Sequence, residues 1–253
     1  MNNSFINELK QLTQNPIQIH LTGIGFVAEI KGCFSIHFIE LKKLNYNISL
    51  PEFSFTCNFP QITLFENDWN EKREIVVSRL NSLLGSNCRI AARKTKFLKI
   101  NRLEAYEFLC KNHFNVPVKA KYNFGLFFEN ELVAIACFGP IMHKKNENKG
   151  EYSGELIRFC SKTGYTVTGA LSKLLKHFTN IYSVNDIMTY IDKDWSDGKS
   201  FIKVGFEKVG ENNRFTHFFN PTTQHFESES KKTIAIKKNG LLKLIKKIEP
   251  SNN

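Results

Sequence analysis

The segment Glu155–Phe178, ELIRFCSKTGYTVTGALSKLLKHF, contains the change of backbone pattern that decides the fold. We interpret Glu155–Ser161 as a strand, Lys162–Gly169 as a turn with two glycines, and Ala170–Phe178 as an amphipathic helix. A strand that runs through such a turn into a helix offers free backbone N–H groups, and the helix dipole adds positive potential there. The segment therefore predicts a phosphate or pyrophosphate site.

The glycine spacing distinguishes this turn from the common nucleotide-binding loops. Gly164 and Gly169 have the spacing of the glycines in a Walker A loop, but Ala170 and Leu171 stand where that loop has Lys and Ser or Thr. The GxGxxG pattern of dinucleotide-binding proteins is absent as well. These features disfavour hydrolysis of ATP or GTP. An ordinary glycine turn before a helix is the competing interpretation.

Shorter apolar segments extend the pattern in both directions. Downstream of residue 95, the spacing of apolar residues predicts the order β-α-β-β-β-α-β-α-β-β. The strands are expected at 96–100, 122–128, 132–139, 155–161, 186–191, 206–209 and 215–219, and the helices at 103–113, 170–178 and 199–204. Upstream, residues 17–59 predict a few short strands, and residues 71–84 predict a helix that ends at Gly85.

The composition limits the class of protein and its location. The 253 residues, 42% of them hydrophobic, suffice for a folded core, and no apolar run reaches the roughly 18 residues of a membrane span. The first residues lack the basic and apolar regions of a secretory signal, so we expect a cytoplasmic protein. Six cysteines without a CxxC pair then predict reduced thiols, and no metal site is expected.

The charge predicts an anionic partner. Lys and Arg number 35 against 24 Asp and Glu, which gives a formal net charge of +11. This favours nucleic acid, a phosphorylated cofactor, or both. Residues 231–253 carry seven of the lysines and one acid, and their apolar positions fit a basic amphipathic helix after Gly240. Such a tail would bind nucleic acid or an acidic membrane surface, or would serve as a mobile, solubilising end.

A second unit, Phe201-Ile202-Lys203-Val204-Gly205-Phe206, joins a predicted helix to a strand. Together with the order of strands and helices, it resembles the GNAT N-acyltransferase family, in which an F/Y-x-K-x-G-F unit follows the fifth strand. Residues 162–170 occupy the position of the family's pyrophosphate loop, although Thr166 stands where that loop has Gln or Arg. The resemblance implies an α+β fold, layered α/β/α, with a mixed and mainly antiparallel central sheet.

The same resemblance implies a cofactor and the residues that hold it. The cofactor is acetyl-CoA or another acyl-CoA, and its pyrophosphate would lie at the turn after the fourth strand. The implied cofactor-binding residues are Cys160, Ser161, Lys162, Gly164, Tyr165, Thr166, Val167, Thr168, Gly169, Ala170 and Phe201.

Further motifs narrow the resemblance to phage proteins. Segments of phage homing-endonuclease-like proteins are similar, in the same order, to 62–76, 92–94, 112–113, 155–160 and 190–198. The C-terminal module of those proteins is similar to the phage Mom family, which modifies adenine in DNA. The similarity covers about residues 60–220.

This resemblance implies three parts. They are a small N-terminal α/β region at 1–90, a GNAT-like transferase domain at 91–222 and a basic C-terminal tail at 223–253. In the similar phage proteins a nuclease module comes first, but residues 1–60 show no Asp…Glu-x-Lys spacing that indicates a nuclease site. We therefore expect the first part to be a remnant or a replacement of that module.

Four side chains are candidates for moving protons during acyl transfer: Asp192, Tyr190, Ser196 and His113. Asp192 ends the predicted fifth strand, where its carboxylate would act as a general base toward an amine. Asp192, Asp194 and Ser196 also suit caps of a turn. Tyr190 would protonate a leaving thiolate, or would lie in the core. His113 would shuttle a proton, or would end a helix at which positive charge is favoured.

A basic run and one aromatic residue are candidates for nucleic-acid binding. Arg89, Arg93, Lys94 and Lys96 would follow a DNA backbone through phosphate contacts, or would form a solvated face. Trp195 would stack on a flipped base, or would pack beneath its own turn.

Three classes of function remain open. The leading hypothesis is a GNAT-like acyltransferase of phage type that acts on an amine, such as a DNA base amine. The second is a DNA-binding module without catalysis, and the third is an N-acetyltransferase of small molecules or proteins. Only the first two predict DNA binding with a steep dependence on salt.

Overall fold

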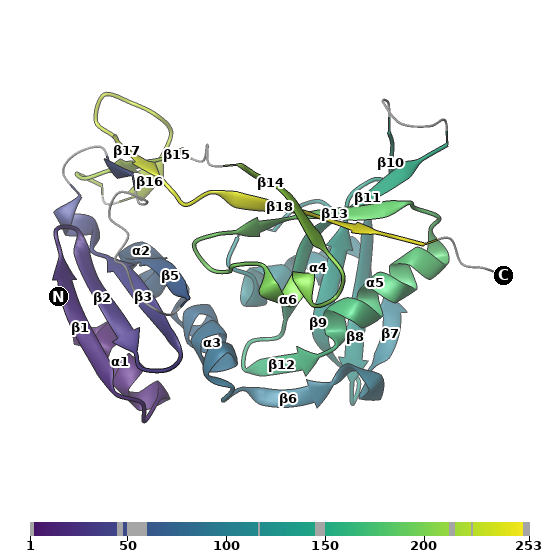
Figure 1. Ribbon diagram of the computed structural model, residues 1–253, viewed down its shortest axis with the longest axis horizontal. Coiled ribbons are helices and arrows are strands. Elements are labelled where there is room, and N and C mark those ends of the chain that lie inside the picture. The colour runs from purple at the N-terminus through teal and green to yellow at the C-terminus, as the bar shows by residue number, and fades with distance from the viewer. Residues whose placement is uncertain are drawn as a thin grey trace. The chain divides into compact units, whose positions relative to one another are not determined.

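The computed structural model describes residues 3–44, 48–49, 60–115, 117–144, 150–212, 216–223 and 225–249 (Figure 1). The chain forms two compact units, and neither is contiguous in sequence. Unit 1 comprises Met1–Val76, Ile191–Gly198 and Gly210–Leu242, and unit 2 comprises Val77–Tyr190, Lys199–Val209 and Lys243–Asn253. The ranges expected from the sequence are contiguous, whereas both of these units draw on the C-terminal part of the chain.

The first part of unit 1 is a four-stranded sheet with helices. Its elements are α1 (Asn3–Leu12), β1 (Ile17–Thr22), β2 (Gly25–Ile30), β3 (Phe34–Ile39), β5 (Gln61–Phe65) and α2 (Glu66–Glu71), and the strand order is β1-β2-β3-β5. Phe5 of α1 lies 4.7 Å from Phe38 and 5.1 Å from Trp69, ring centre to ring centre. This aromatic core covers one face of the sheet. The short strands predicted in this region are confirmed for β1, β2 and β3.

A second sheet completes unit 1 with residues from the C-terminal part of the chain. It contains β4 (Ile48–Ser49), β15 (Thr216–Asn220), β16 (His225–Glu227) and β17 (Ile234–Lys237), in the order β16-β15-β17-β4. The strand expected at 215–219 thus exists over its described residues, while Phe215 lies outside them. It does not extend the main sheet, because Phe219 and Ile236 bury their side chains in a core of their own with Phe65 and Leu41.

The main sheet confirms the expected fold class. It contains β7 (Lys96–Lys99), β8 (Tyr122–Phe128), β9 (Glu131–Phe138), β11 (Tyr152–Ser161), β13 (Asp186–Asp192), β14 (Glu207–Asn212) and β18 (Leu241–Lys247), and the short β10 (Met142–His143) pairs with β11. The strand order is β14-β18-β13-β11-β9-β8-β7. The pairs β7–β8, β8–β9 and β9–β11 are antiparallel, and β11–β13 is parallel. The sheet is therefore mixed and mainly antiparallel.

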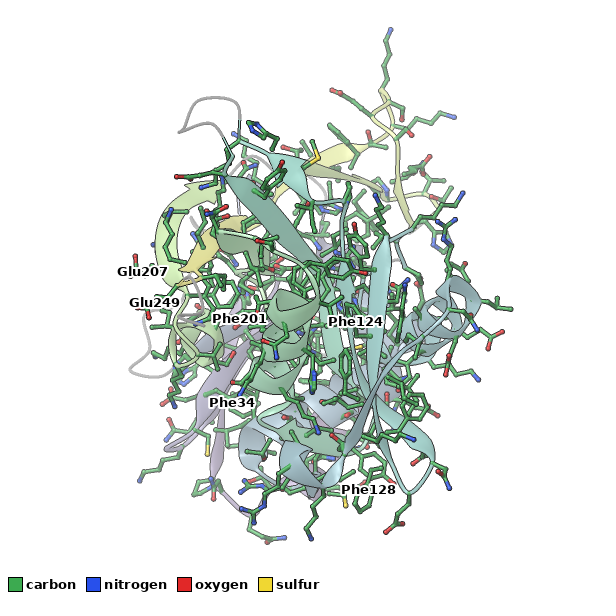
Figure 2. The ribbon with its side chains drawn as sticks, turned by 90° about the vertical axis from the view of Figure 1, so that its right-hand side faces the viewer. Phe34, Phe124, Phe128, Phe201, Glu207 and Glu249 are labelled. Carbon is green, nitrogen blue, oxygen red and sulfur yellow. The ribbon has the colours of Figure 1, made fainter. Side chains whose placement is uncertain are left out.

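Helices on both faces of this sheet make the expected α/β/α layers. On one face, Phe108 and Leu109 of α4 (Arg102–Asn112) share a core with Ile135 and Cys137 of β9. On the other face, Phe178 of α5 (Ala170–Ile181) stacks on Phe138, with 3.9 Å between ring centres. Phe124 of β8, labelled in Figure 2, contacts the same two rings. Alternate residues of β9 therefore face opposite helices, as its period of two requires.

The remaining elements, whose residues belong to unit 2 except for Arg73–Val76, support the connections between these strands. They are α3 (Arg73–Leu84), β6 (Cys88–Ala91), the 3-10 turn η3 (Ala92–Lys94), β12 (Tyr165–Thr168) and α6 (Lys199–Ile202). The predicted helix over 71–84 is confirmed as α3, and Gly85 after it has the positive φ of +78° that suits a helix-ending glycine.

The predicted helix after Gly240 is wrong, because Leu241–Lys247 forms the strand β18. Leu242 and Leu244 are buried, which is the period of a strand. Two of the three lysines of β18 have partners within unit 2. Lys246 Nζ donates to the carbonyl of Val204 at 2.8 Å, and Lys247 Nζ lies 3.6 Å from the buried carboxylate of Asp186. The apolar spacing fits both a helix and a strand, and pairing with β13 and β14 decides between them.

Candidate functional site

The turn that follows β11 has the strand, turn and helix expected from the sequence. Gly164 and Gly169 both have φ of +83°, a left-handed conformation that residues with a side chain rarely adopt. Gly169 is the residue before the first turn of α5. Between the two glycines lies an unexpected short strand, β12, which pairs in parallel with β6 from Tyr165↔Cys88 to Thr168↔Ala91.

The tip of this turn donates its backbone N–H groups to other parts of unit 2. The N–H of Thr163 donates to Asn112 Oδ1 at 2.7 Å, and the N–H of Gly164 donates to Ser78 Oγ at 2.8 Å. The N–H of Tyr165 donates to the carbonyl of Lys162 at 3.0 Å. These three donors are therefore directed toward the protein.

The first turn of α5 differs from the tip. The first N–H groups of any α-helix have no partner within the helix, and Gly169 has no side chain to cap them. Thr168, Gly169 and Ser172 are exposed. The helix dipole places partial positive charge at this end. A phosphate group thus fits the start of α5, Gly169–Ser172, rather than the whole of the implied cofactor segment.

Lys173 connects α5 to η3. Its Nζ donates to the carbonyl of Ala92 at 3.0 Å and to Thr95 Oγ1 at 3.3 Å, and it also contacts the carbonyl of Thr95. A Cβ built on Gly169 would lie 3.6 Å from that of Ala92. The start of α5 is therefore fixed closely against residues 92–95. Sequence reasoning singled out neither Lys173 nor its partners, because nothing local marks a contact between such distant segments.

This contact brings the basic run next to the start of α5. Arg89 lies on β6, Arg93 and Lys94 lie in η3, and Lys96 lies on β7, all four with exposed side chains. Because β6 pairs with β12, the run follows the turn along its length. The backbone of the basic run at residues 92–95 thus lies beside the position that fits a phosphate.

The strands β11 and β13 stop pairing partway along their length. The paired residues run from Ser153↔Asp186 to Leu156↔Thr189, although β11 continues to Ser161. Thr189 Oγ1 donates to the carbonyl of Leu156 at 2.8 Å, where the pairing ends. A bulge in β11 follows, between Leu156 and Arg158. On this edge, the described part of β11 after Leu156 has no neighbouring strand.

The polar side chains near the bulge are largely buried. Burial lowers the pKa of Arg158, and the neighbouring Cys137 opposes this effect. Burial also raises the pKa of the Cys137 thiol to about 12 and raises that of Cys160 further. Both thiols therefore stay protonated at neutral pH. Cys160 is thus a packing residue of β11 rather than a nucleophile.

Two of the predicted catalytic residues, Tyr190 and His113, belong to unit 2. Both are distant in sequence from the turn after β11, and they have different environments. Tyr190 follows the last residue of β13 that pairs with β11 and is 41% exposed, so it does not lie in the core. His113 ends α4, and its Nδ1 accepts the N–H of Asn115 at 3.0 Å. Phe201 of α6 makes an edge contact with Phe206 at 5.5 Å, as a packing residue does.

The segment after β13 belongs to unit 1 and forms a tight turn. Asp192 Oδ1 accepts the N–H of Asp194 at 2.9 Å, and the carbonyl of Asp192 accepts the N–H of Ser196 at 3.0 Å. Ser196 Oγ in turn accepts the N–H of Gly198 at 3.1 Å. Asp192 and Ser196 therefore make the turn-capping contacts that were the competing interpretation. Trp195 is 8% exposed, so its indole packs inside the protein instead of presenting a face to a base.

Asp194 is the most perturbed carboxyl group of this turn. It is 2% exposed, and Asn239 Nδ2 donates to its Oδ1 at 2.7 Å. Lys238 Nζ lies 4.0 Å from its Oδ2, and Asn239 also donates to Thr63 Oγ1 at 3.1 Å. Burial, together with the charge of Asp192, raises the pKa of Asp194 to about 6. The sequence indicated only a capping residue here, because neither burial nor the contact with residues 238–239 is visible locally.

Three further findings bear on the class of protein. Among the described residues, no group of three or more His, Cys, Asp and Glu side chains is placed to hold a metal ion. The described cysteines, Cys33, Cys88, Cys110, Cys137 and Cys160, are free, and Cys57 lies outside the described residues. Within the part of the chain that the structure describes, no helix has the length and apolar character needed to cross a membrane.

Comparison with known proteins finds similarity at the level of structure. No protein-family model and no curated protein matches the sequence. Solved structures that are similar include Naa50 of Arabidopsis thaliana in complex with a bisubstrate analogue, at 12% identity and a TM-score of 0.44, over 61% of this chain and 99% of that chain. The ribosomal-protein-S18-alanine N-acetyltransferase of Escherichia coli is similar at 11% identity and a TM-score of 0.41, over 63% and 98%.

A Bacillus subtilis acetyltransferase in complex with CoA is also similar, at 12% identity and a TM-score of 0.41, over 62% of this chain and all of that chain, 100%. Each TM-score is below 0.5, so no property of these proteins is transferred to this chain. Its fold class follows from the strand order and the two helical layers of its own main sheet.

Proposed function

We propose that the chain is an acyl-CoA-dependent N-acyltransferase. The observation that carries the proposal is the start of α5, where an uncapped helix N-terminus follows a left-handed Gly169 and lies against the basic run 89–96. This arrangement combines backbone donors and a helix dipole at one position, with cationic residues on the adjoining segment. It suits a ligand that carries several phosphates, as CoA does. The motif resemblance to GNAT proteins supplies the reaction.

The donor would be held by few residues. Its pyrophosphate would accept hydrogen bonds from the first N–H groups of α5, Ala170–Ser172, and Arg93 and Lys94 would neutralise its negative charge. When bound, the donor supplies an acyl group activated as a thioester. The edge of β11 beyond Leu156, which has no neighbouring strand within the described residues, would receive the pantetheine arm through its backbone groups.

Proton transfer would involve side chains of β13 and of the turn after it. Attack on a thioester requires an amine without its extra proton, and the departing thiolate then takes up a proton. Tyr190 is exposed just beyond the paired part of β13, so its hydroxyl would donate that proton. Asp192 stays a proposed general base on the sequence pattern alone, and in unit 1 its Oδ1 accepts the N–H of Asp194. In this proposal Ser196 and His113 hold turns.

The proposed acceptor is an amine of a DNA base. Support for this part comes from the resemblance to phage Mom-like proteins and from the formal net charge of +11. A base within a duplex would have to leave the stack before its amine could reach the donor. Because Trp195 is buried, another residue would have to support the flipped base.

Calorimetric titration of the full chain with acetyl-CoA tests the donor. We expect binding that weakens as salt is raised, since phosphates and cations form the contact. An Arg93→Gln, Lys94→Gln double variant should bind several times more weakly. Absence of acetyl-CoA binding, together with salt-dependent binding of duplex DNA, would instead support a DNA-binding module without catalysis.

Mass spectrometry of nucleosides tests the acceptor. DNA from cells that express the chain should contain an acylated or otherwise enlarged base that is absent when Tyr190 and Asp192 are replaced by Phe and Asn. Binding of acetyl-CoA with unchanged nucleosides would exclude DNA as the acceptor, and would favour a protein or a small molecule.

A further inference from the structure

We infer that Ser78 and Asn112 are positioning residues for the donor site, and that they act by holding the turn between β11 and α5. This inference rests on the proposed function, because it concerns how the same site receives its phosphates. Neither side chain lies in the turn or in α5. Ser78 belongs to α3 and Asn112 is the last residue of α4.

The two side chains take the donors at the tip of the turn. Asn112 Oδ1 accepts the N–H of Thr163 at 2.7 Å, and Ser78 Oγ accepts the N–H of Gly164 at 2.8 Å. Both are short, well-formed bonds between segments that are distant in sequence. Gly164 is exposed and has a positive φ of +83°, so without these bonds the tip would have the conformational freedom of a glycine turn.

Further contacts show that the turn is attached along its length. Ser82 Oγ lies 3.1 Å from Thr166 Oγ1, and the N–H of Cys88 donates to the carbonyl of Gly164 at 3.1 Å. Asn112 is itself fixed, because its Nδ2 donates to the carbonyl of Phe108 at 2.8 Å. The tip of the turn is thus bound to α3, α4 and β6. The segment that leads to Gly169 therefore begins from a fixed position.

This geometry separates two groups of donors. The N–H groups of Thr163 and Gly164 point to α3 and α4, so they cannot converge on a ligand at the start of α5. Phosphates would therefore bind only at Gly169–Ser172, and Ser78 and Asn112 would ensure that this position is formed before the donor arrives. Preorganisation of this kind raises affinity because the turn is not ordered during binding.

The test compares CoA binding by the full chain and by four variants. We expect Ser78→Ala and Asn112→Ala each to raise the Kd for CoA about fivefold, since each removes one hydrogen bond that orders the turn. Inorganic pyrophosphate should lose affinity in parallel. Ser78→Thr keeps the hydroxyl and should restore binding. Asn81→Ala, on the same helix, changes a polar side chain that accepts no N–H of the turn, and should bind as the unaltered chain does.

The outcomes are distinct. Unchanged Kd values in Ser78→Ala and Asn112→Ala would overturn the inference while leaving the proposed function intact. Tighter CoA binding by these variants would also overturn it, because Ser78 and Asn112 would then compete with the donor. If the unaltered chain binds neither CoA nor pyrophosphate, the proposed function fails before any substitution is compared, and the inference fails with it.

Discussion

Two neighbouring parallel strands, β11 and β13, lead into turns of opposite character. The turn after β11, in unit 2, is held by neutral side chains and leads to the positive end of α5, with Lys173 and the basic run beside it. The turn after β13, in unit 1, is built around the carboxylates of Asp192 and Asp194. The first turn suits an anion and the second repels one. Turns with similar positions in a sheet therefore differ in chemistry because of the side chains that they carry, the element that follows them and the distant residues that hold them.

The largest effect should come from removing the strand that pairs beside β13. A chain that ends after Gly240 loses β18 and exposes the space that Leu242 and Leu244 fill. Burial of two leucines alone is worth roughly 3–6 kcal/mol, so we expect unfolding or a large fall in the midpoint of thermal unfolding. Circular dichroism during heating measures this. If the shortened chain still binds CoA at the turn after β11 and still shows the titration of Asp194 in the turn after β13, neither turn depends on the complete sheet.

A smaller, pH-dependent effect should arise at Asp194. Its pKa is raised to about 6 in the folded state, so between about pH 4 and pH 6 the folded protein binds more protons than the unfolded chain. The free energy of unfolding therefore falls as pH rises through this range, by up to roughly 3 kcal/mol from this group. Asp194→Asn removes the titration, so the variant should gain stability relative to the unaltered chain as pH rises from 4.5 to 7.

Urea unfolding at several pH values checks this prediction. The quantity to follow is the difference between the two proteins, because other carboxyl groups titrate in both. Asn239→Ala provides a matched control, since loss of its hydrogen bonds should raise the pKa of Asp194 and move the transition to higher pH. The prediction is contradicted if the difference in the free energy of unfolding between Asp194→Asn and the unaltered chain stays constant from pH 4.5 to 7. Asp194 would then not have a raised pKa in the folded protein.

The smallest effect should follow the loss of one contact beside the first turn. Lys173→Met keeps most of the side chain but removes the ammonium that binds Ala92 and Thr95. We expect a loss of about 2 kcal/mol in the free energy of unfolding and weaker CoA binding, because hydrogen bonds from a charged group are stronger than average. Lys176→Met, on the exposed side of α5, is the control and should change neither. Equal effects of both variants would show that general charge, not the contact, matters.

The first of the two turns was far more visible in the sequence than the second. Glycines followed by leucines at helical spacing are local signals, so the strand and α5 are confirmed to within three residues, although β12 inside the turn was not predicted. The roles of Ser78, Asn112 and Lys173 were not, because they depend on contacts between segments far apart in the chain. The carboxylates after β13 were recognised as capping residues, but burial of Asp194 by residues 238–239 leaves no local pattern.

The C-terminal residues show the same limit most clearly. The lysines and leucines of this segment satisfied the period of a basic helix, whereas in the structure Lys246 and Lys247 of β18 bind Val204 and Asp186. Which period applies is decided by the strands on either side of the segment. The fold class could be predicted because the order of strands and helices is local information, while the last member of the sheet could not.

The position of β18 has a consequence for the route by which the chain folds. β18 follows β13 and β14 in sequence, yet it lies between them in the sheet. β13 and β14 therefore cannot reach their final spacing until residues 241–247 have been synthesised and have entered the space between them. Pairing across such sequence separation is slow, and it leaves strand edges open in the partly made chain. Refolding should accordingly end with insertion of β18, and unpaired edges of β13 and β14 would be the principal risk of aggregation during synthesis.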